Sequence, residues 1–530
     1  MCDHSTRALG LEHGAAHDHD HAAWTRRGFL VRSGLAAAGA AFLAGAGPVH
    51  AAVRGAAERP GLLGALRALE TDRVLVLVQL AGGNDGLNTV VPVADDRYYT
   101  ARPSVALAAA DTVRLADGVG AHPSLEPLLR SWGDGHLSIV QGVGYEDQSL
   151  SHFEGIDVWA SAREDRGQYG WTAQAAGALG GAASVPPSVQ VGASFPLLMT
   201  SPDGVEGMTL SSPELLDQIV TSGELYDTTA LPASPYGRQL AFLRDVANDA
   251  NVYVGSMRAA ADGVANAAEY PDDGFGRSLA QVARLIKGRL GTRVYLVRLG
   301  GFDTHAGQLA AHAGLLDRLA RSLTAFYADL KASGDDARTV TMTFSEFGRR
   351  VAQNGSAGTD HGTAAPVLLL GPSVAGGLVG PAPDLGDLDR SGNLRVSTDF
   401  RSVYASVLGT WLGLDAAVTA SILGGTYAPL GLFQSGVATE GGPGPGLALS
   451  VSPNPVTTRA RVTYTVPSAG RAEVAAYDAT GRRVAVLAAG EHGAGPYEAA
   501  FDTSALAAGV YLVRVQTPGG AASRSVTVVR

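Results

Sequence analysis

The chain has 530 residues, a formal net charge of −10 at pH 7, 46% apolar and 17% charged residues, and one cysteine, Cys2. This length exceeds one ordinary hydrophobic core, so we expect two or more domains. The apolar content is that of a globular chain. The acidic balance, without a basic stripe beyond the N-terminus, excludes nucleic acid as a partner.

The first 51 residues have the organisation of an export signal. Residues 1–24 carry five histidines, which we interpret as a low-complexity tract rather than a metal site. Arg26 and Arg27 precede an apolar run at 34–47 that is shorter than the roughly 20 residues needed to span a bilayer. The segment resembles a twin-arginine signal. We therefore expect cleavage after Ala51, passage through the inner membrane by the twin-arginine translocon, and a mature chain with no membrane span and no cysteine.

Apolar runs end at polar residues throughout the central part of the chain. We predict buried strands at residues 74–80, 137–143, 293–299 and 367–370, and a further one in the run that opens at Thr339 and stops at Glu346. Such strands are typical of a mostly parallel sheet sandwiched by helices, in which ligands bind beyond the carboxyl ends of the strands. Carboxylates and imidazoles stand at these ends, namely Asp85, Asp303, His305, Glu346, Asp360 and His361. They indicate a metal site or an acid-base site.

Several ungapped blocks within residues 73–432 resemble a known family. The blocks are VLVLVQLAGGNDGLNTVVP (74–92), SHFEGIDVW (151–159), GGFDTHAGQ (300–308), FSEFGR (344–349), TDHGTA (359–364) and STDFRSVYASVLGTWLG (397–413). They are similar to the bacterial family catalogued as domain of unknown function 1501, which is grouped with the alkaline phosphatase and sulfatase superfamily. The resemblance implies an alkaline-phosphatase-like α/β domain over residues 73–432.

The resemblance also implies roles for individual residues. Ser151, at the start of a predicted helix, takes the place of the nucleophile, with His152 beside it as a second catalytic residue. The six polar residues at the strand ends take the place of the metal ligands, and carboxylates with imidazoles suit zinc, manganese, magnesium or calcium. The family spacing Asp-x-x-x-His is Asp-x-His here, at Asp303 and His305.

Plainer structural interpretations remain open for two of these positions. Asn84 and Asp85 have the composition of a turn, and Ser151 has the composition of a helix cap. The sulfatase mechanism is excluded in its usual form, because the C/S-x-P-x-R sequence that supplies its formylglycine does not occur.

We expect residues 163–290 to hold helices and loops that form a lid over the sheet. Apolar spacing predicts helices at 237–258 and 275–290, and a further helix at 309–330. Asp399 is the expected N-cap of a helix that runs to Trp411, with Arg401 in a structural role.

The C-terminal part differs in pattern from the rest of the chain. Residues 433–446 are a Gly/Pro-rich linker by composition. Seven short strand-like runs follow within 447–530, which predicts a small all-β, immunoglobulin-like sandwich. The blocks SPNPVTTRARVTYTV and FDTSALAAGVYLVRV resemble the C-terminal sorting domain of type IX secretion cargo. That resemblance implies the type IX secretion machinery as partner and the cell surface or the medium as destination; an adhesion module of the same fold is the alternative.

Two functions are consistent with these patterns. The first is an exported metal-dependent hydrolase of phosphate esters, in which ions polarise the phosphoryl oxygens and Ser151 or a bound water attacks. The second is a non-catalytic cell-surface protein that retains the fold and a structural ion.

Overall fold

The structure is a computed structural model. It describes residues 72–179, 184–192, 197–202, 204–205, 207–212, 226–227, 231–232, 234–434, 449–452, 456–466, 468–477, 483–507, 509–517 and 520–529. The predicted signal segment and nearly all of the predicted linker lie outside these residues.

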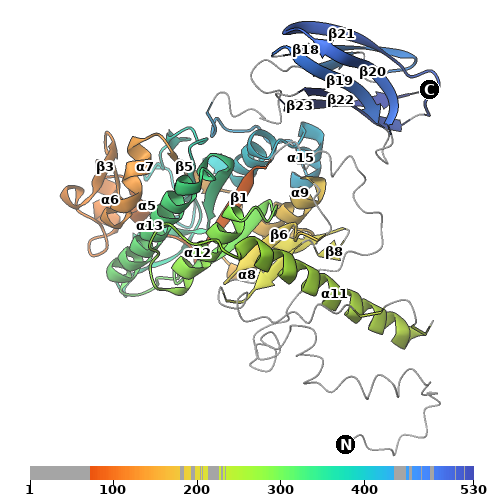
Figure 1. The fold of residues 1–530 in the computed structure, drawn as a ribbon. Helices are drawn as coiled ribbons and strands as arrows, with labels where there is room; N and C mark the ends of the chain where they lie inside the picture. Colours follow the sequence, from red (N-terminus) through yellow and green to blue (C-terminus); the bar gives the residue numbers. More distant parts are fainter. Residues whose placement is uncertain are drawn as a thin grey trace, which may run out of the picture.

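A large sheet forms the centre of the α/β unit, residues 72–434 (Figure 1). Among the described residues it has nine strands. Eight lie in the order β15 (Gly377–Val379), β5 (Leu137–Gly144), β14 (Ala365–Leu370), β11 (Thr339–Phe344), β1 (Val74–Ala81), β10 (Val294–Gly300), β6 (Ser188–Val191) and β9 (Met208–Leu210), and β16 (Thr398–Asp399) pairs with β5. Strand β14 runs antiparallel to both of its neighbours, and the other recorded pairings are parallel. The predicted α/β class with a mostly parallel sheet is confirmed.

Helices cover both faces of the sheet because β1 is apolar on both sides. Val76 and Val78 face a core shared with α11 (Pro235–Ala261), α12 (Gly274–Lys287) and α13 (Gln308–Ser333). Leu75 and Leu77 face a second core shared with α8 (His152–Ser161), α9 (Trp171–Leu179), α14 (Phe400–Ala405) and α15 (Ala416–Leu423). Every residue of β1 is buried, as a strand covered on both faces requires.

Short elements surround this frame. They are α5 (Gly86–Thr89), α6 (Asp96–Ala101), α7 (Leu129–Gly133), the 3₁₀ turns η1 (Ala109–Asp111), η2 (Pro123–Leu128), η3 (Leu197–Met199) and η4 (Asp336–Arg338), the π-helical η5 (Ser406–Trp411), and the small strands β2 (Val90–Val91), β3 (Val113–Ala116), β4 (Val119–Ala121), β7 (Thr200–Ser201), β8 (Gly204–Val205), β12 (Gly348–Gln353) and β13 (Thr359–Gly362). Asp399 caps α14 as predicted, since its Oδ1 accepts from the Arg401 N–H at 2.8 Å.

The predicted lid region contributes to the sheet itself. Strands β6 and β9 both come from residues 163–290, where we expected only helices and loops. The strands are short and carry buried polar residues such as Gln190, 1% exposed, so they lack the apolar run that marks a buried strand. Helices α11, α12 and α13 lie within one to three residues of their predicted bounds.

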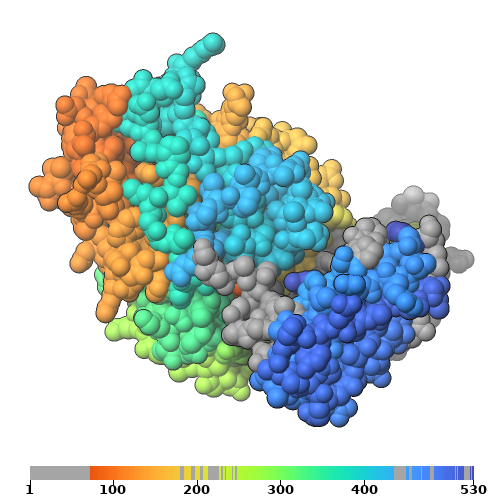
Figure 2. Space-filling view, turned by 90° about the horizontal axis from the view of Figure 1, so that it is seen from above, coloured from red at the N-terminus to blue at the C-terminus, as the bar shows by residue number. Residues whose placement is uncertain are grey.

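The two ends of the α/β unit are joined by buried contacts. Arg73 donates to the Trp411 carbonyl at 2.7 Å and lies over the indole ring, 4.9 Å from its centroid. The indole N–H donates in turn to the Val74 carbonyl at 3.1 Å. On the surface, an orange segment of the unit lies beside a cyan segment (Figure 2), and Arg97 pairs with Asp384 at 3.3 Å.

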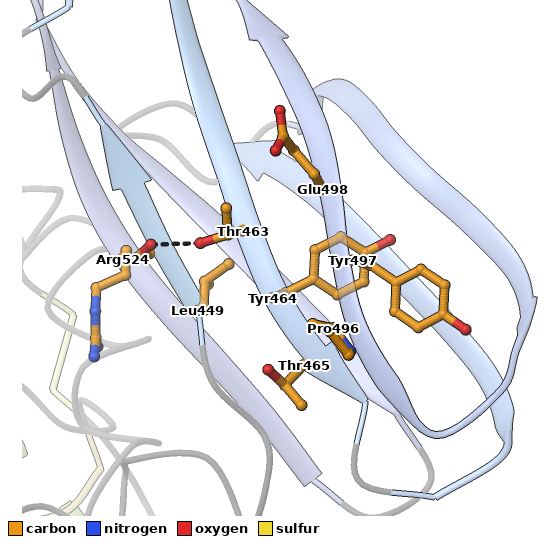
Figure 3. A pocket seen from close by; sticks show the side chains of 9 residues that line it. Leu449, Thr463, Tyr464, Thr465, Pro496, Tyr497, Glu498 and Arg524 are labelled. Carbon is orange, nitrogen blue, oxygen red and sulfur yellow. Dashed lines mark hydrogen bonds between the residues drawn. The ribbon is translucent and has the colours of Figure 1, made fainter.

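The C-terminal residues form a β-sandwich. One sheet has the order β17 (Leu449–Ser452), β18 (Arg459–Val466), β21 (Gly495–Asp502), and the other has β20 (Arg483–His492), β19 (Gly470–Tyr477), β22 (Gly509–Thr517), β23 (Gly520–Val528). Both sheets contribute to one apolar core, which confirms the predicted all-β fold. A hollow of about 540 Å³ on the sandwich is lined by Tyr464, Tyr497 and the oppositely charged Glu498 and Arg524 (Figure 3).

No helix within the described residues combines the length and the apolar composition that a membrane span requires.

A buried charged group ties α13 to its neighbours. Asp329 is fully buried and accepts from Lys287 at 2.6 Å, Asn266 at 2.7 Å, Tyr270 at 3.0 Å and the Ala267 N–H at 2.8 Å. Burial alone would raise the pKa of Asp329, but the bonds from Asn266 and Lys287 outweigh burial and lower the pKa. Asp329 is therefore ionised in the folded protein at neutral pH.

We predict that Asp329→Asn lowers the free energy of unfolding of the α/β unit by about 3 kcal/mol, because it leaves the Lys287 ammonium buried without a countercharge. Since the folded-state pKa of Asp329 lies below its unfolded value, the stabilisation is complete above about pH 4 and is lost as the pH falls through the folded pKa. Urea unfolding followed by tryptophan fluorescence measures the difference in the free energy of unfolding. The last tryptophan is Trp411, so the β-sandwich contributes no signal and the fluorescence reports on the α/β unit. Asp317→Asn, in the exposed pair with Arg321, is the matched control; an equal loss in both variants would contradict the prediction.

Candidate metal centre

Six of the predicted site residues lie together at one edge of the sheet. Asp303 and His305 follow β10, and Glu346 follows β11. His152 begins α8, and Asp360 and His361 lie on β13. The chain from β13 reaches the same edge because β14 runs antiparallel and therefore starts where the parallel strands end. One potential ligand atom from each of His152, Asp303 and His361 lies within 4.8 Å of the other two.

Three atoms form the centre of this cluster. The Nε2 atoms of His305 and His361 are 3.0 Å apart, and each lies close to Asp303 Oδ1, at 3.1 and 3.0 Å. The triangle resembles one face of a tetrahedron, because four ligands at about 2.0–2.1 Å from an ion are about 3.3 Å from each other. We call Asp303, His305 and His361 the ion triad.

The partners of the two imidazoles assign their tautomers. His305 Nδ1 lies 3.0 Å from Asp360 Oδ1 and His361 Nδ1 lies 2.9 Å from the Leu150 carbonyl oxygen. Both partners accept hydrogen bonds, so each Nδ1 carries the proton and each Nε2 carries a lone pair in the neutral ring. Three acceptors thus face each other, and neither imidazole supplies a donor between them. A cation at the triad removes this repulsion.

Asp303 is held ionised from the opposite side. Burial would raise the pKa of Asp303, but the hydrogen bond from Arg349 and the charge of its guanidinium outweigh burial and lower the pKa. Arg349 is fully buried and donates to Asp303 Oδ1 at 2.6 Å. The triad therefore offers an anionic ligand without releasing a proton at neutral pH.

Glu346 and His152 form a second pair beside the triad. The Glu346 side chain is buried, and its Oε1 accepts from the Gly82 N–H at 2.8 Å and lies 2.9 Å from His152 Nδ1. His152 Nε2 then lies 3.6 Å from Asp303 Oδ2. Phe347 backs the rings of His152 and His361, with centroid distances of 4.9 and 4.4 Å. Glu346 Oε2 is buried and has no hydrogen-bond partner among the described residues. It is therefore a further acceptor that needs a donor or a cation.

The turn after β1 has room only for glycine. Gly82 has φ +122°, and a Cβ there would lie 2.3 Å from the Asp303 backbone nitrogen. The Gly82 N–H donates to Glu346, so this close approach joins the ends of β1, β10 and β11.

Ser151 occupies the N-cap position of α8, and its side chain makes no capping bond. The residue is exposed, and its neighbours on both sides contact the cluster, Leu150 through its carbonyl and His152 through its ring. A ten-residue helix directs free N–H groups and the positive end of its dipole outward at this position. An anion is favoured there.

Asp85 has a different environment from the one we predicted. Its Oδ1 accepts from the Leu87 and Asn88 N–H groups at the start of α5, and its Oδ2 accepts from Arg102 at 2.6 Å and from Gln308. Burial would raise the pKa of Asp85, but the Arg102 charge outweighs burial and lowers the pKa. Both oxygens are occupied, so we revise the prediction and assign Asp85 to the turn and cap interpretation.

Asp360 also differs from its predicted role. Its Oδ1 accepts from Asn354 at 3.0 Å and from His305 at 3.0 Å. The bonds from Asn354 and His305 lower the pKa of Asp360, so the residue is an anion that orients His305. Such outer carboxylates fix the ring of a ligand and raise its basicity. We revise Asp360 from ligand to orienting residue.

The residues present fit a divalent ion. Two imidazoles and one carboxylate are a donor set typical of zinc, and three protein ligands leave a position for a fourth. The unpartnered Glu346 Oε2 and the three facing lone pairs are the observations in favour of an ion. Arg349 and Asn354, which orient the ligands, were not predicted, because only the fold brings them to Asp303 and Asp360.

The fold and this site describe a two-part chain, an α/β unit with a candidate metal centre followed by a β-sandwich. Residues 243–423 match the family described as protein of unknown function (DUF1501). Residues 450–529 match the family described as secretion system C-terminal sorting domain. The two resemblances inferred from the sequence are confirmed over these segments, and the second implies export to the cell surface or the medium.

Other comparisons add little about activity. No curated protein matches the chain. Similar solved structures include the lipoteichoic acid synthase LtaP from Listeria monocytogenes (9% identity, 67% of this chain and 76% of that chain, TM-score 0.29). They also include a protein of the alkaline phosphatase superfamily from Vibrio parahaemolyticus (10%, 75% and 76%, 0.32) and the phosphonate monoester hydrolase of Agrobacterium radiobacter (10%, 82% and 90%, 0.27). Values this low support no inference about activity.

We predict that His361→Ala weakens the binding of zinc by at least about tenfold, because it removes one of three protein ligands. Competition with a fluorescent chelator, checked by elemental mass spectrometry after dialysis, measures the change. His136→Ala is the control, since His136 directly precedes β5 at the other edge of the sheet. Equal zinc binding by the wild type and His361→Ala would rule out the triad as a zinc site.

Proposed function

We propose that the chain is an exported metal-dependent hydrolase that acts on phosphate esters. The observation that carries the proposal is the ion triad, three lone-pair atoms 3.0–3.1 Å apart, next to an exposed helix start. The likeness of residues 243–423 to DUF1501 is consistent with it.

Each residue then has a chemical role. Asp303, His305 and His361 would hold the ion, which supplies Lewis-acid polarisation of a phosphoryl oxygen. Ser151 would be the nucleophile, and the first N–H groups of α8 would bind the phosphoryl oxygens. His152 would accept the Ser151 proton at Nε2, with its ring oriented through Nδ1 by Glu346. This arrangement of nucleophile, base and orienting carboxylate is common in covalent catalysis.

The proposed reaction has two stages, phosphorylation of Ser151 and hydrolysis of the phosphoserine. Ser151 Oγ bonds to phosphorus while the bond from phosphorus to the ester oxygen breaks, and the proton taken by His152 passes to the leaving oxygen. Water then cleaves the phosphoserine and regenerates Ser151. The net reaction is ester plus water giving alcohol plus phosphate.

We predict that Ser151→Ala lowers kcat by at least about a hundredfold and abolishes acid-stable labelling by a ³²P-labelled ester, while zinc binding stays within twofold of the wild type. The zinc measurement shows that the ion triad is intact. Full labelling of the Ser151→Ala protein would overturn the role of Ser151. Zinc-loaded wild type that hydrolyses no phosphate ester would favour the non-catalytic alternative with a structural ion.

Export is proposed in two steps. Arg26 and Arg27 would direct the folded chain through the inner membrane by the twin-arginine translocon, and the sandwich would then engage the type IX secretion machinery. The match of residues 450–529 to the sorting domain supports the second step.

We predict that a chain ending at Gln434 folds and binds zinc but stays inside the cell envelope, because the α/β unit has its own apolar cores and the sorting domain is missing. Immunoblots of surface, envelope and medium fractions measure the distribution. The full chain with Ser151→Ala is the control and is expected at the surface. A shortened chain that reached the surface would refute the sorting role.

A further inference from the structure

The hydroxyl of Ser149 lies between Ser151 and the third residue of α8. Ser149 Oγ accepts from the Ser151 N–H at 3.3 Å and donates to Glu154 Oε2 at 2.8 Å. The backbone of Ser149 is fixed as well, since its N–H donates at 3.1 Å to the hydroxyl of Tyr145, a residue that is 4% exposed. The Ser149 side chain therefore connects two groups that a helix cap often joins directly.

The sequence of this helix start is that of a capping box. Ser151 and Glu154 have the spacing S-x-x-E. In such a box the serine hydroxyl accepts from the N–H of the glutamate, and the carboxylate accepts from the N–H of the serine. In the structure the Ser151 side chain makes no capping bond, and the Glu154 carboxylate is linked to the Ser151 N–H through the Ser149 hydroxyl. The hydroxyl of Ser149 thus takes part in the cap, and that of Ser151 does not.

Glu154 is oriented toward Ser149 by a guanidinium. Arg166 Nη1 donates to Glu154 Oε1 at 3.1 Å, which leaves Oε2 for Ser149. Arg166 has φ +55°, a left-handed conformation that is uncommon for residues other than glycine. Both side chains of this pair are about half exposed, at 53% and 47%, so the pair adds little to stability. Its positive charge offsets that of Glu154, so the start of α8 still favours an anion.

We propose that Ser149 and Glu154 are positioning residues that keep the Ser151 hydroxyl out of the helix cap and available for reaction. The inference rests on the proposed function, because Ser151 would be the nucleophile. A hydroxyl that caps a helix points a lone pair at a backbone N–H of the first turn. Such a hydroxyl would have to break this bond and rotate before it attacked phosphorus. With Ser149 in the cap, the Ser151 hydroxyl needs no such rotation.

A pair of variants at Ser149 tests the inference. Ser149→Ala removes the hydroxyl, so Glu154 and Ser151 are expected to form the direct capping box. The crystal structure of this variant should then show Ser151 Oγ within about 3.2 Å of the Glu154 nitrogen. With p-nitrophenyl phosphate we expect kcat to fall about tenfold and KM to change less than about twofold, because the attacking group is misoriented while the binding groups remain. Ser149→Thr retains a hydroxyl and is expected to restore both the orientation of Ser151 and kcat.

Ser234→Ala is the matched control at another helix start. Ser234 caps α11, where its Oγ accepts from the Gly237 N–H at 3.1 Å. Loss of this ordinary cap is expected to lower the melting temperature and to leave kcat and the orientation of Ser151 unchanged. A fall in kcat equal to that of Ser149→Ala would show that lost stability alone explains the effect, and the inference would be overturned.

The crystal structures separate this inference from the proposed function, because they require no turnover. A Ser151 hydroxyl that caps α8 in Ser149→Ala but not in the wild type supports the positioning role even in a protein that hydrolyses no ester. An unmoved hydroxyl in Ser149→Ala, or an unchanged kcat in an active enzyme, refutes the role and leaves the proposed function standing. If Ser149→Ala does not fold, the wild-type crystal structure decides: Ser151 Oγ bonded to the Glu154 N–H overturns the inference, and a bridging Ser149 hydroxyl beside an unbonded Ser151 Oγ supports it.

Discussion

The arrangement of the candidate metal centre depends on one buried guanidinium. Arg349 is 1% exposed and donates to the carbonyl oxygens of Gly83 at 2.8 Å, Thr359 at 2.8 Å and Phe302 at 3.0 Å, besides the Asp303 carboxylate. These oxygens lie after β1, on β13 and after β10. The planar fork of donors on arginine fixes their relative positions. Asp303 alone cannot satisfy all the donors of the buried guanidinium, so the carbonyl oxygens of Gly83, Thr359 and Phe302 must accept the others. The three segments that carry these carbonyls are therefore held in place together with the ion triad.

The same guanidinium sets a balance of charge at the triad. Arg349 keeps Asp303 ionised, which favours an ion, but its own positive charge 2.6 Å from Asp303 Oδ1 repels one. The outer partners of the imidazoles act in the opposite direction. Asp360 accepts a hydrogen bond from His305 Nδ1, and this bond raises the electron density at His305 Nε2. The triad thus combines a weakened carboxylate with a strengthened imidazole as candidate ligands.

The sequence predicted the main strands of the sheet and the residues at their ends, because a long apolar run that stops at a carboxylate is a local pattern. It did not predict the role of Asp85, which depends on Arg102, 17 positions away along the chain and buried against it. No local pattern distinguishes a ligand aspartate from one that caps α5. The contacts of Asp360 were unpredictable for a similar reason, since Asn354 lies in the loop between β12 and β13 and His305 follows β10, 55 positions away along the chain.

The position of the helix start relative to the triad follows from packing rather than from the site residues themselves. Gly155, in the first turn of α8, lies against Glu346, since a Cβ there would be 3.0 Å from the Glu346 carbonyl oxygen. Any larger side chain would push the helix away from the edge of the sheet, and Ser151 and His152 would move with it. Glu346 also accepts from Gly82 and contacts His152. One buried carboxylate therefore links the start of α8 to the strand ends, so the position of Ser151 relative to the ion triad is set by the core of the protein.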